Sequence, residues 1–238
     1  MNRTRKNACW YRSRHWWLAF LVLACLSGFV SAQAPPTVGA PPVAVVTFTL
    51  DFPESTPSHY SIAVEETAHA SYESTVKVED AGEETYRSTF EVSSSTRERI
   101  FEWAKQAKFF EKKIDSGNHK IAFTGQKILS YQNGQQSSTA QYNYSNLEPV
   151  RQLTALFQNM AATLDYGRKL SYLHRYQKLA LDEQLREMET QARNNQLGEI
   201  QALTPVLQEI VDDPSVINGV RARARDLIQM SNRTVPGR

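Results

Sequence analysis

The sequence has only two cysteines, Cys9 and Cys25, and both lie in its first 32 residues. The rest of the 238-residue chain therefore has no disulfide to stabilise it and no thiol for catalysis. Its stability must come from an ordinary hydrophobic core, and the chain is long enough to bury one.

A strong excess of charge of either sign is also missing. The chain has 27 Lys and Arg residues, of which five fall in 1–32, leaving 22 basic residues against 25 acidic ones. A domain so close to neutral gives no support to binding of nucleic acid, and we expect no nucleic-acid partner.

The common catalytic motifs are absent too. The sequence contains no His-Glu-x-x-His motif, no Gly-x-Ser-x-Gly elbow, no phosphate-binding glycine loop and no dinucleotide fingerprint. We therefore assign no catalytic residue, no metal ligand and no cofactor. One pair stays open: His119 follows Asp115 by four residues, and an imidazole near a carboxylate could bind a metal or move a proton. Such residues are also common in exposed loops.

Residues 1–32 have the pattern of a secretory signal. An apolar run from Trp16 to Val30 ends in the small residues Ser31 and Ala32, and five cations precede it: Arg3, Arg5, Lys6, Arg12 and Arg14. This pattern predicts cleavage after Ala32 and export to the periplasm or the exterior.

Two alternatives for this segment stay open. The run is somewhat shorter than the ~20 residues that span a bilayer, but Trp16-Trp17 would suit a membrane interface, so the segment could remain as an uncleaved anchor. It could also carry a lipid on Cys25, since residues 22–25 loosely resemble a lipobox. Membrane contact is expected only through this segment. Residues 33–44 contain four prolines and predict an extended linker.

From residue 45 apolar and polar residues alternate, which is typical of strands with one buried face. Four such segments, joined by short polar connections, predict an antiparallel meander: 46–52, 60–65, 72–78 and 86–92. A helix over 96–110, opened by a capping box of Ser95 and Glu98, offers an apolar face to cover the sheet.

Two further strands are predicted around an Asn133-Gly134 hairpin turn. The first would carry Ile121, Phe123, Leu129 and Tyr131 on one face, with Gly125 as a bulge inside the strand. The second would place Tyr142 and Tyr144 opposite those aromatics. Residues 45–145 thus predict a β-β-β-β-α-β-β domain.

Residues 146–238 predict about four helices, so the fold class is α+β. The first helix, 147–164, follows the hairpin closely and is expected to pack on the sheet; the second either continues it or bends away near Gly167. Asp213 or Ser215 is expected to cap the last helix. Residues 199–230 resemble one HEAT-type helical hairpin, through Asp212-Asp213 and Val220-Arg221 with Ala224, and this resemblance implies a shape but no function.

The predicted function is an exported, non-enzymatic module that binds a protein or an envelope component. A membrane-tethered structural or assembly protein of the envelope is the first alternative. A hydrolase, with a site assembled from residues far apart in sequence, is the second.

Overall fold

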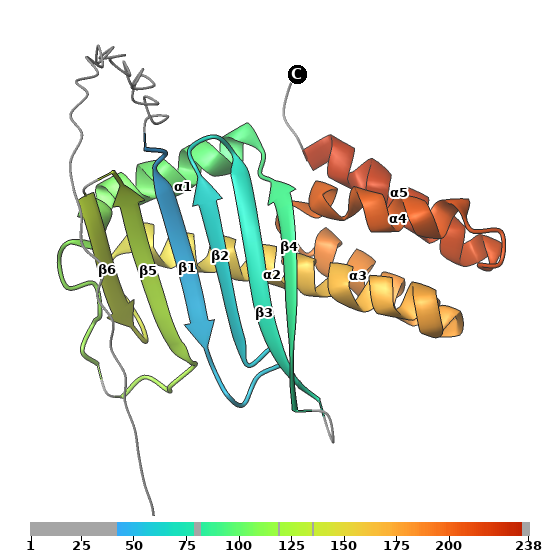
Figure 1. The fold of residues 1–238 in the computed structure, drawn as a ribbon, viewed down its shortest axis with the longest axis horizontal. Coiled ribbons are helices and arrows are strands. Elements are labelled where there is room, and N and C mark those ends of the chain that lie inside the picture. The colour runs from blue at the N-terminus through green and yellow to red at the C-terminus, as the bar shows by residue number, and fades with distance from the viewer. Residues whose placement is uncertain (1–41, 79–81, 119, 135, 235–238) are drawn as a thin grey trace, which may run out of the picture. The chain divides into compact units, whose positions relative to one another are not determined.

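Alternating side chains produce a six-stranded, fully antiparallel sheet (Figure 1). The computed structural model describes residues 42–78, 82–118, 120–134 and 136–234, so the expected signal lies outside the described residues. The order across the sheet is β4-β3-β2-β1-β5-β6. The strands are β1 (Val45–Asp51), β2 (His59–Glu65), β3 (His69–Val78), β4 (Gly82–Glu91), β5 (Gln126–Asn133) and β6 (Gln136–Tyr142).

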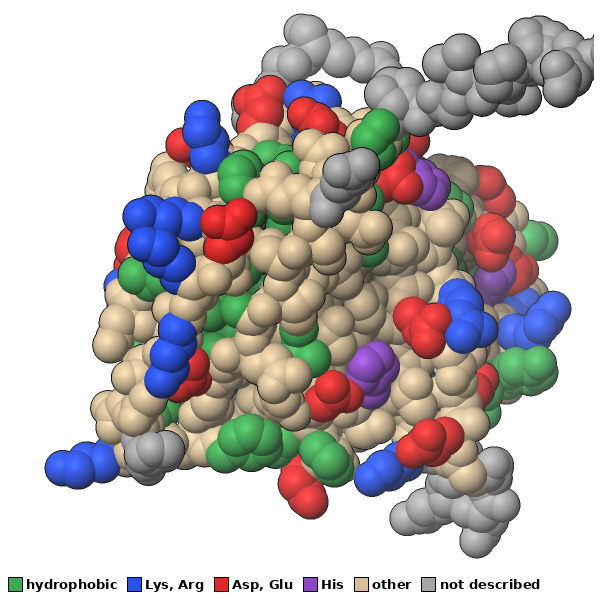
Figure 2. Space-filling view, turned by 60° about the vertical axis from the view of Figure 1, so that its left-hand side comes forward, with side chains coloured by type: hydrophobic (Ala, Val, Ile, Leu, Met, Phe, Trp, Pro, Cys, Tyr) green, Lys and Arg blue, Asp and Glu red, His purple; other side chains and the backbone are tan. Residues whose placement is uncertain are grey.

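The two faces of this sheet differ in chemistry. In β1, for example, Val46, Phe48 and Leu50 are buried, while the residues between them are partly exposed. The opposite face is rich in small hydroxyl side chains, and the middle of Figure 2 is correspondingly short of charge. The strand register places on it Thr47, Thr49, Ser61, Ser71, Thr75, Thr85, Thr89, Ser130, Ser137 and Thr139.

Two helices, α1 (Ser94–Gln106) and α2 (Glu148–Tyr176), cover the apolar face. Ile100 of α1 is fully buried in this core. Phe157 of α2 stacks on Phe48, with ring centroids 5.4 Å apart and planes 7° from parallel. Dispersion attraction and the hydrophobic effect both grow with the contact area between two rings, so this stacked pair helps to hold α2 on the sheet.

The C-terminal half of α2 belongs to a second hydrophobic cluster, around Leu170. Its partners are α3 (Leu181–Arg193), α4 (Thr204–Asp212) and α5 (Asn218–Thr234), with the 3₁₀ turns η2 (Lys178–Ala180) before α3 and η3 (Ile200–Leu203) before α4. A further 3₁₀ turn, η1 (Lys108–Phe110), follows α1 and belongs to the core on the sheet. The predicted α+β class, with an N-terminal meander and about four C-terminal helices, is confirmed. The described strands and helices all lie in one compact unit. Within the described ranges, no helix is both long and apolar enough to cross a bilayer.

Two predictions for the second hairpin were wrong. β5 begins at Gln126, and Gly125 forms the corner before it with a φ of +92°. A Cβ at Gly125 would lie 2.8 Å from the Cβ of Phe52, so this close approach, not a bulge, requires glycine. The expected aromatic pairs do not form either. Tyr142 pairs in register with Lys127, and Tyr131 stacks on Phe109 of η1 with centroids 4.3 Å apart.

The sequence left open whether the helix continues past Gly167 or bends there, and α2 continues through it. A Cβ at Gly167 would meet Leu203 Cδ2 at 2.6 Å, so close packing explains this glycine. The expected cap of the last helix was wrong. Asp213 and Ser215 do not cap the last helix, which begins at Asn218. Instead Asp213 Oδ1 accepts the Ser215 amide at 2.9 Å, within the turn that precedes α5.

Replacing Phe157 tests how far the core depends on the stacked pair. Phe157→Ala should lower the free energy of unfolding by about 3–5 kcal/mol, because the lost ring leaves a cavity at a fully buried position. Phe123→Ala is the matched control, since Phe123 is 60% exposed and its loss should cost about 0.5 kcal/mol. Urea unfolding measures both, and equal losses would contradict this description of the core.

Candidate functional site

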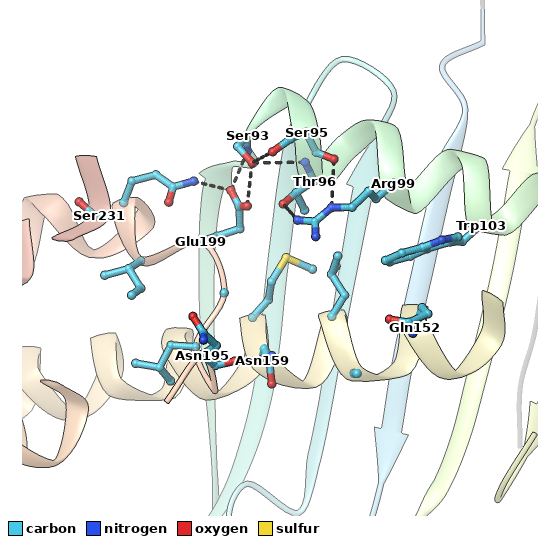
Figure 3. Close-up of a pocket in the computed structure, with 17 residues that line it drawn as sticks. Ser93, Ser95, Thr96, Arg99, Trp103, Gln152, Asn159, Asn195, Glu199 and Ser231 are labelled. Carbon is cyan, nitrogen blue, oxygen red and sulfur yellow. Dashed lines mark hydrogen bonds between the residues drawn. The ribbon is translucent and has the colours of Figure 1, made fainter. Parts of the chain in front are cut away.

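A groove of about 300 Å³ lies between α1 and α2 and is closed at one end by residues 195–201 (Figure 3). Both helices are packed on the sheet, so the walls of the groove are held by the main core. A concave site of this volume is at the small end of the range typical of ligand pockets.

The α1 wall presents Arg99 and Trp103 side by side. Arg99 Nε donates to the Ser95 carbonyl at 3.3 Å, and Nη2 donates to Thr96 Oγ1 at 3.1 Å. The guanidinium carbon lies 6.0 Å from the centre of the Trp103 ring, within reach of a cation–π contact. Arg99 Nη1 and the Trp103 indole N–H make no hydrogen bond with any described residue. The wall therefore offers two unused donors, one on the exposed Arg99 cation and one on the Trp103 ring.

The α2 wall combines two carboxamides with an apolar floor. Gln152 Nε2 donates to Glu148 at 2.5 Å, and Asn159 Nδ2 donates to the Asn195 carbonyl at 3.4 Å. The side-chain oxygens of Gln152 and Asn159 accept no hydrogen bond from the described residues. Leu156 and Met160, which also line the groove, provide the floor.

Glu199 holds the closed end of the groove against α1. Its Oε2 accepts the Ser93 amide at 2.6 Å, its Oε1 accepts the Ser93 hydroxyl at 2.9 Å, and it also accepts from Gln201 Nε2. Ser93 is the N-cap of α1, because its Oγ accepts the Thr96 amide at 3.3 Å.

The predicted capping box of Ser95 and Glu98 was therefore wrong. In a capping box a carboxylate three residues along accepts the N-cap amide. Here a carboxylate 106 residues along the chain does so, and the positive end of the helix dipole favours it.

The segment that carries Glu199 is fixed on α2 as well. Gly198 donates its amide to Thr163 Oγ1 at 3.1 Å and to the Asn159 carbonyl at 3.2 Å. Glu199 itself has a φ of +55°, a left-handed conformation that costs a residue with a Cβ about 1–2 kcal/mol. The contacts to Ser93 and to α2 hold it in this conformation.

The loop singled out in the sequence has a structural role in the described residues. Asp115 accepts the amides of Asn143 at 2.9 Å and Gly117 at 2.6 Å, and these bonds lower the pKa of its carboxyl group. His119 lies outside the described residues. No group of three or more metal-ligating side chains occurs in the part of the chain that the structure describes.

Sequence reasoning missed the groove. Trp103 shares the helical spacing of Ile100, but it is only partly buried: it packs at the edge of the core and also lines the groove. The one available signal was that Trp103 is the only tryptophan after residue 32.

Two substitutions of Glu199 separate the stability that its hydrogen bonds contribute from the stability that its left-handed backbone costs. Glu199→Ala should lower the free energy of unfolding by about 2 kcal/mol, since hydrogen bonds to a charged group contribute about 1.5–3 kcal/mol. Glu199→Gly loses the same bonds but tolerates the left-handed conformation, so its loss should be about 1 kcal/mol smaller. Chemical denaturation measures both against the exposed control Glu66→Ala. Identical stabilities for the Ala and Gly variants would disprove the strain.

No protein-family model matches the chain, and no curated protein matches its sequence.

Proposed function

We propose that this protein is an exported, non-enzymatic binding module whose α1–α2 groove holds an extended segment of a partner protein. The observation that carries this proposal is the pairing of Arg99 and Trp103, both with unused donors, above an apolar floor. An aromatic side chain and an arginine beside each other are typical of the residues that dominate protein interfaces.

The spacing of the free polar groups supports a peptide as the occupant. Gln152 and Asn159 lie seven residues apart on α2, which corresponds to about 10 Å along the helix axis. An extended chain rises about 3.4 Å per residue, so about three of its residues span that distance. The peptide amides can donate to the two carboxamide oxygens while a peptide carbonyl accepts from the Trp103 indole.

The floor and the cation define which side chains the segment should carry. Leu156 and Met160 favour an aliphatic residue, and Met adapts its shape to different occupants. Arg99 favours a neighbouring carboxylate, because its planar guanidinium binds carboxylates well. We therefore expect a motif that combines an aliphatic residue with Asp or Glu.

The groove has fewer side chains suited to catalysis than to peptide binding. Glu199 is the only acidic residue among the described residues that line it, and both of its oxygens already accept hydrogen bonds. These hydrogen bonds, together with one from Gln201, direct the carboxylate at the start of α1, whereas a general base must be directed at the substrate. This favours binding over the hydrolase alternative.

Export rests on residues 1–32 and has its own test. Protein produced from the full-length sequence in a bacterial host should begin at Gln33 when its N-terminus is sequenced, because signal peptidase cleaves after small residues such as Ala32. Retention of the full chain in membranes after alkaline carbonate extraction would instead support the tethered alternative. Full-length protein in the soluble cytoplasmic fraction would refute export.

Peptide binding can be measured at the groove itself. We expect a random phage-displayed library, selected on the chain that begins at Gln33, to enrich the aliphatic–acidic motif. The bound peptide should shift the fluorescence of Trp103, the single tryptophan of that chain. Arg99→Ala should weaken binding at least tenfold, because it removes the cation that pairs with the peptide carboxylate.

Arg97→Ala is the matched control for this measurement, because Arg97 lies on the same helix but does not line the groove. Its peptide affinity should stay within twofold of the parent. Peptides that bind without changing the fluorescence of Trp103, or equally well to the Arg99→Ala variant, would refute the proposal.

A further inference from the structure

A lysine is buried on the core side of the sheet. Lys127 of β5 is only 4% exposed and lies between Leu50 of β1 and Tyr142 of β6 in the strand register. Its Nζ donates to Thr124 Oγ1 at 2.9 Å and to the Asn143 carbonyl at 3.1 Å. Two longer contacts reach the carbonyls of Thr124 at 3.3 Å and Gly125 at 3.4 Å.

All four of these oxygens are neutral, and Lys127 forms no ion pair with any described residue. Its hydrogen bonds are thus satisfied but its charge is not neutralised. A buried charge without an opposite charge is costly, and burial accordingly lowers the pKa of the Lys127 ammonium group. An anion placed beside Nζ would remove this cost.

A pocket of about 420 Å³ opens at the lysine, between the end of the β5–β6 hairpin and α2. Arg151 of α2 supplies a second cation, and no Asp or Glu is among the described residues that line the pocket. Arg151 pairs with Glu148 and donates from Nη1 to the Asn146 carbonyl at 3.3 Å. Apart from Ala155, the remaining lining is made of hydroxyl, amide and aromatic side chains, among them Thr124, Asn143, Tyr142, Tyr144 and Ser145.

We propose that this pocket binds a small molecule through an anionic group, a carboxylate or a phosphate, held between Lys127 Nζ and the Arg151 guanidinium. The anion would replace the two longest contacts of Nζ with a charge-assisted bond, which is stronger than a bond to a neutral carbonyl. The rings of Tyr142 and Tyr144 would contact the apolar part of the ligand.

This site is separate from the α1–α2 groove. The two cavities use different flanks of α2, and Ala155 is the only residue that lines both. Anion binding can therefore succeed or fail independently of peptide binding.

Backbone amide NMR of protein produced from the full-length sequence tests the proposal, with sodium phosphate, sodium benzoate and neutral benzamide as probes at constant ionic strength. One or both anions should cause saturable shifts at Thr124, Asn143 and Ser145, and the stronger of the two identifies the group preferred. Benzamide should cause none. No saturable shift with either anion, or equal shifts with benzamide, would overturn the proposal.

Variants connect the shifts to the two cations. Lys127→Met should weaken anion binding at least tenfold, and Arg151→Gln should weaken it about fivefold. Arg186→Gln, which removes an exposed helical arginine from another ion pair, should leave it within twofold. Unchanged affinity in Lys127→Met would overturn the proposal. If that variant does not fold, unchanged affinity in Arg151→Gln would overturn it.

Discussion

The contact between Glu199 and the N-cap Ser93 joins the C-terminal helical region to the first helix on the sheet. Without it the segment 195–201 would keep its packing against α2, α4 and α5 but lose its hydrogen bonds to the start of α1, so the closed end of the groove would no longer be held there. The contact also explains why a residue with a side chain adopts φ +55° at this position. The Glu199 carboxylate accepts hydrogen bonds from donors at the start of α1 and is attracted by the positive end of the helix dipole. These two interactions offset the cost of the left-handed backbone at Glu199.

α2 gives this arrangement its rigidity. One 29-residue helix contributes its first half to the core beneath the sheet and its second half to the cluster formed with α3, α4 and α5. The groove walls are therefore regular helices held by buried contacts such as Phe48–Phe157. A site on rigid elements loses little conformational entropy when it binds, which favours recognition of a flexible peptide.

The sheet and most helices could be predicted from the sequence because the spacing of apolar residues along a segment indicates whether it forms a strand or a helix. The α+β class follows from that spacing and is confirmed. The predictions were wrong where contacts between residues far apart in the sequence determine the local structure. Gly125 turns a corner because Phe52 approaches it, and α1 begins one residue after Ser93, with Glu199 completing its cap. The groove could not be predicted, since its walls and closed end come from three separate segments. Lys127 shares the parity of buried Leu129, but only the assembled sheet shows that none of the acidic residues the structure describes forms an ion pair with it.

Hydrogen exchange of the chain with and without a selected aliphatic–acidic peptide shows whether the peptide occupies the groove. We expect the peptide to slow exchange at the start of α1 around Thr96 and at Gly198, because binding in the groove stabilises the hydrogen bonds that fix its closed end. Slower exchange confined to strands β1 to β4, with Thr96 and Gly198 unchanged, would show that the peptide does not bind in the groove.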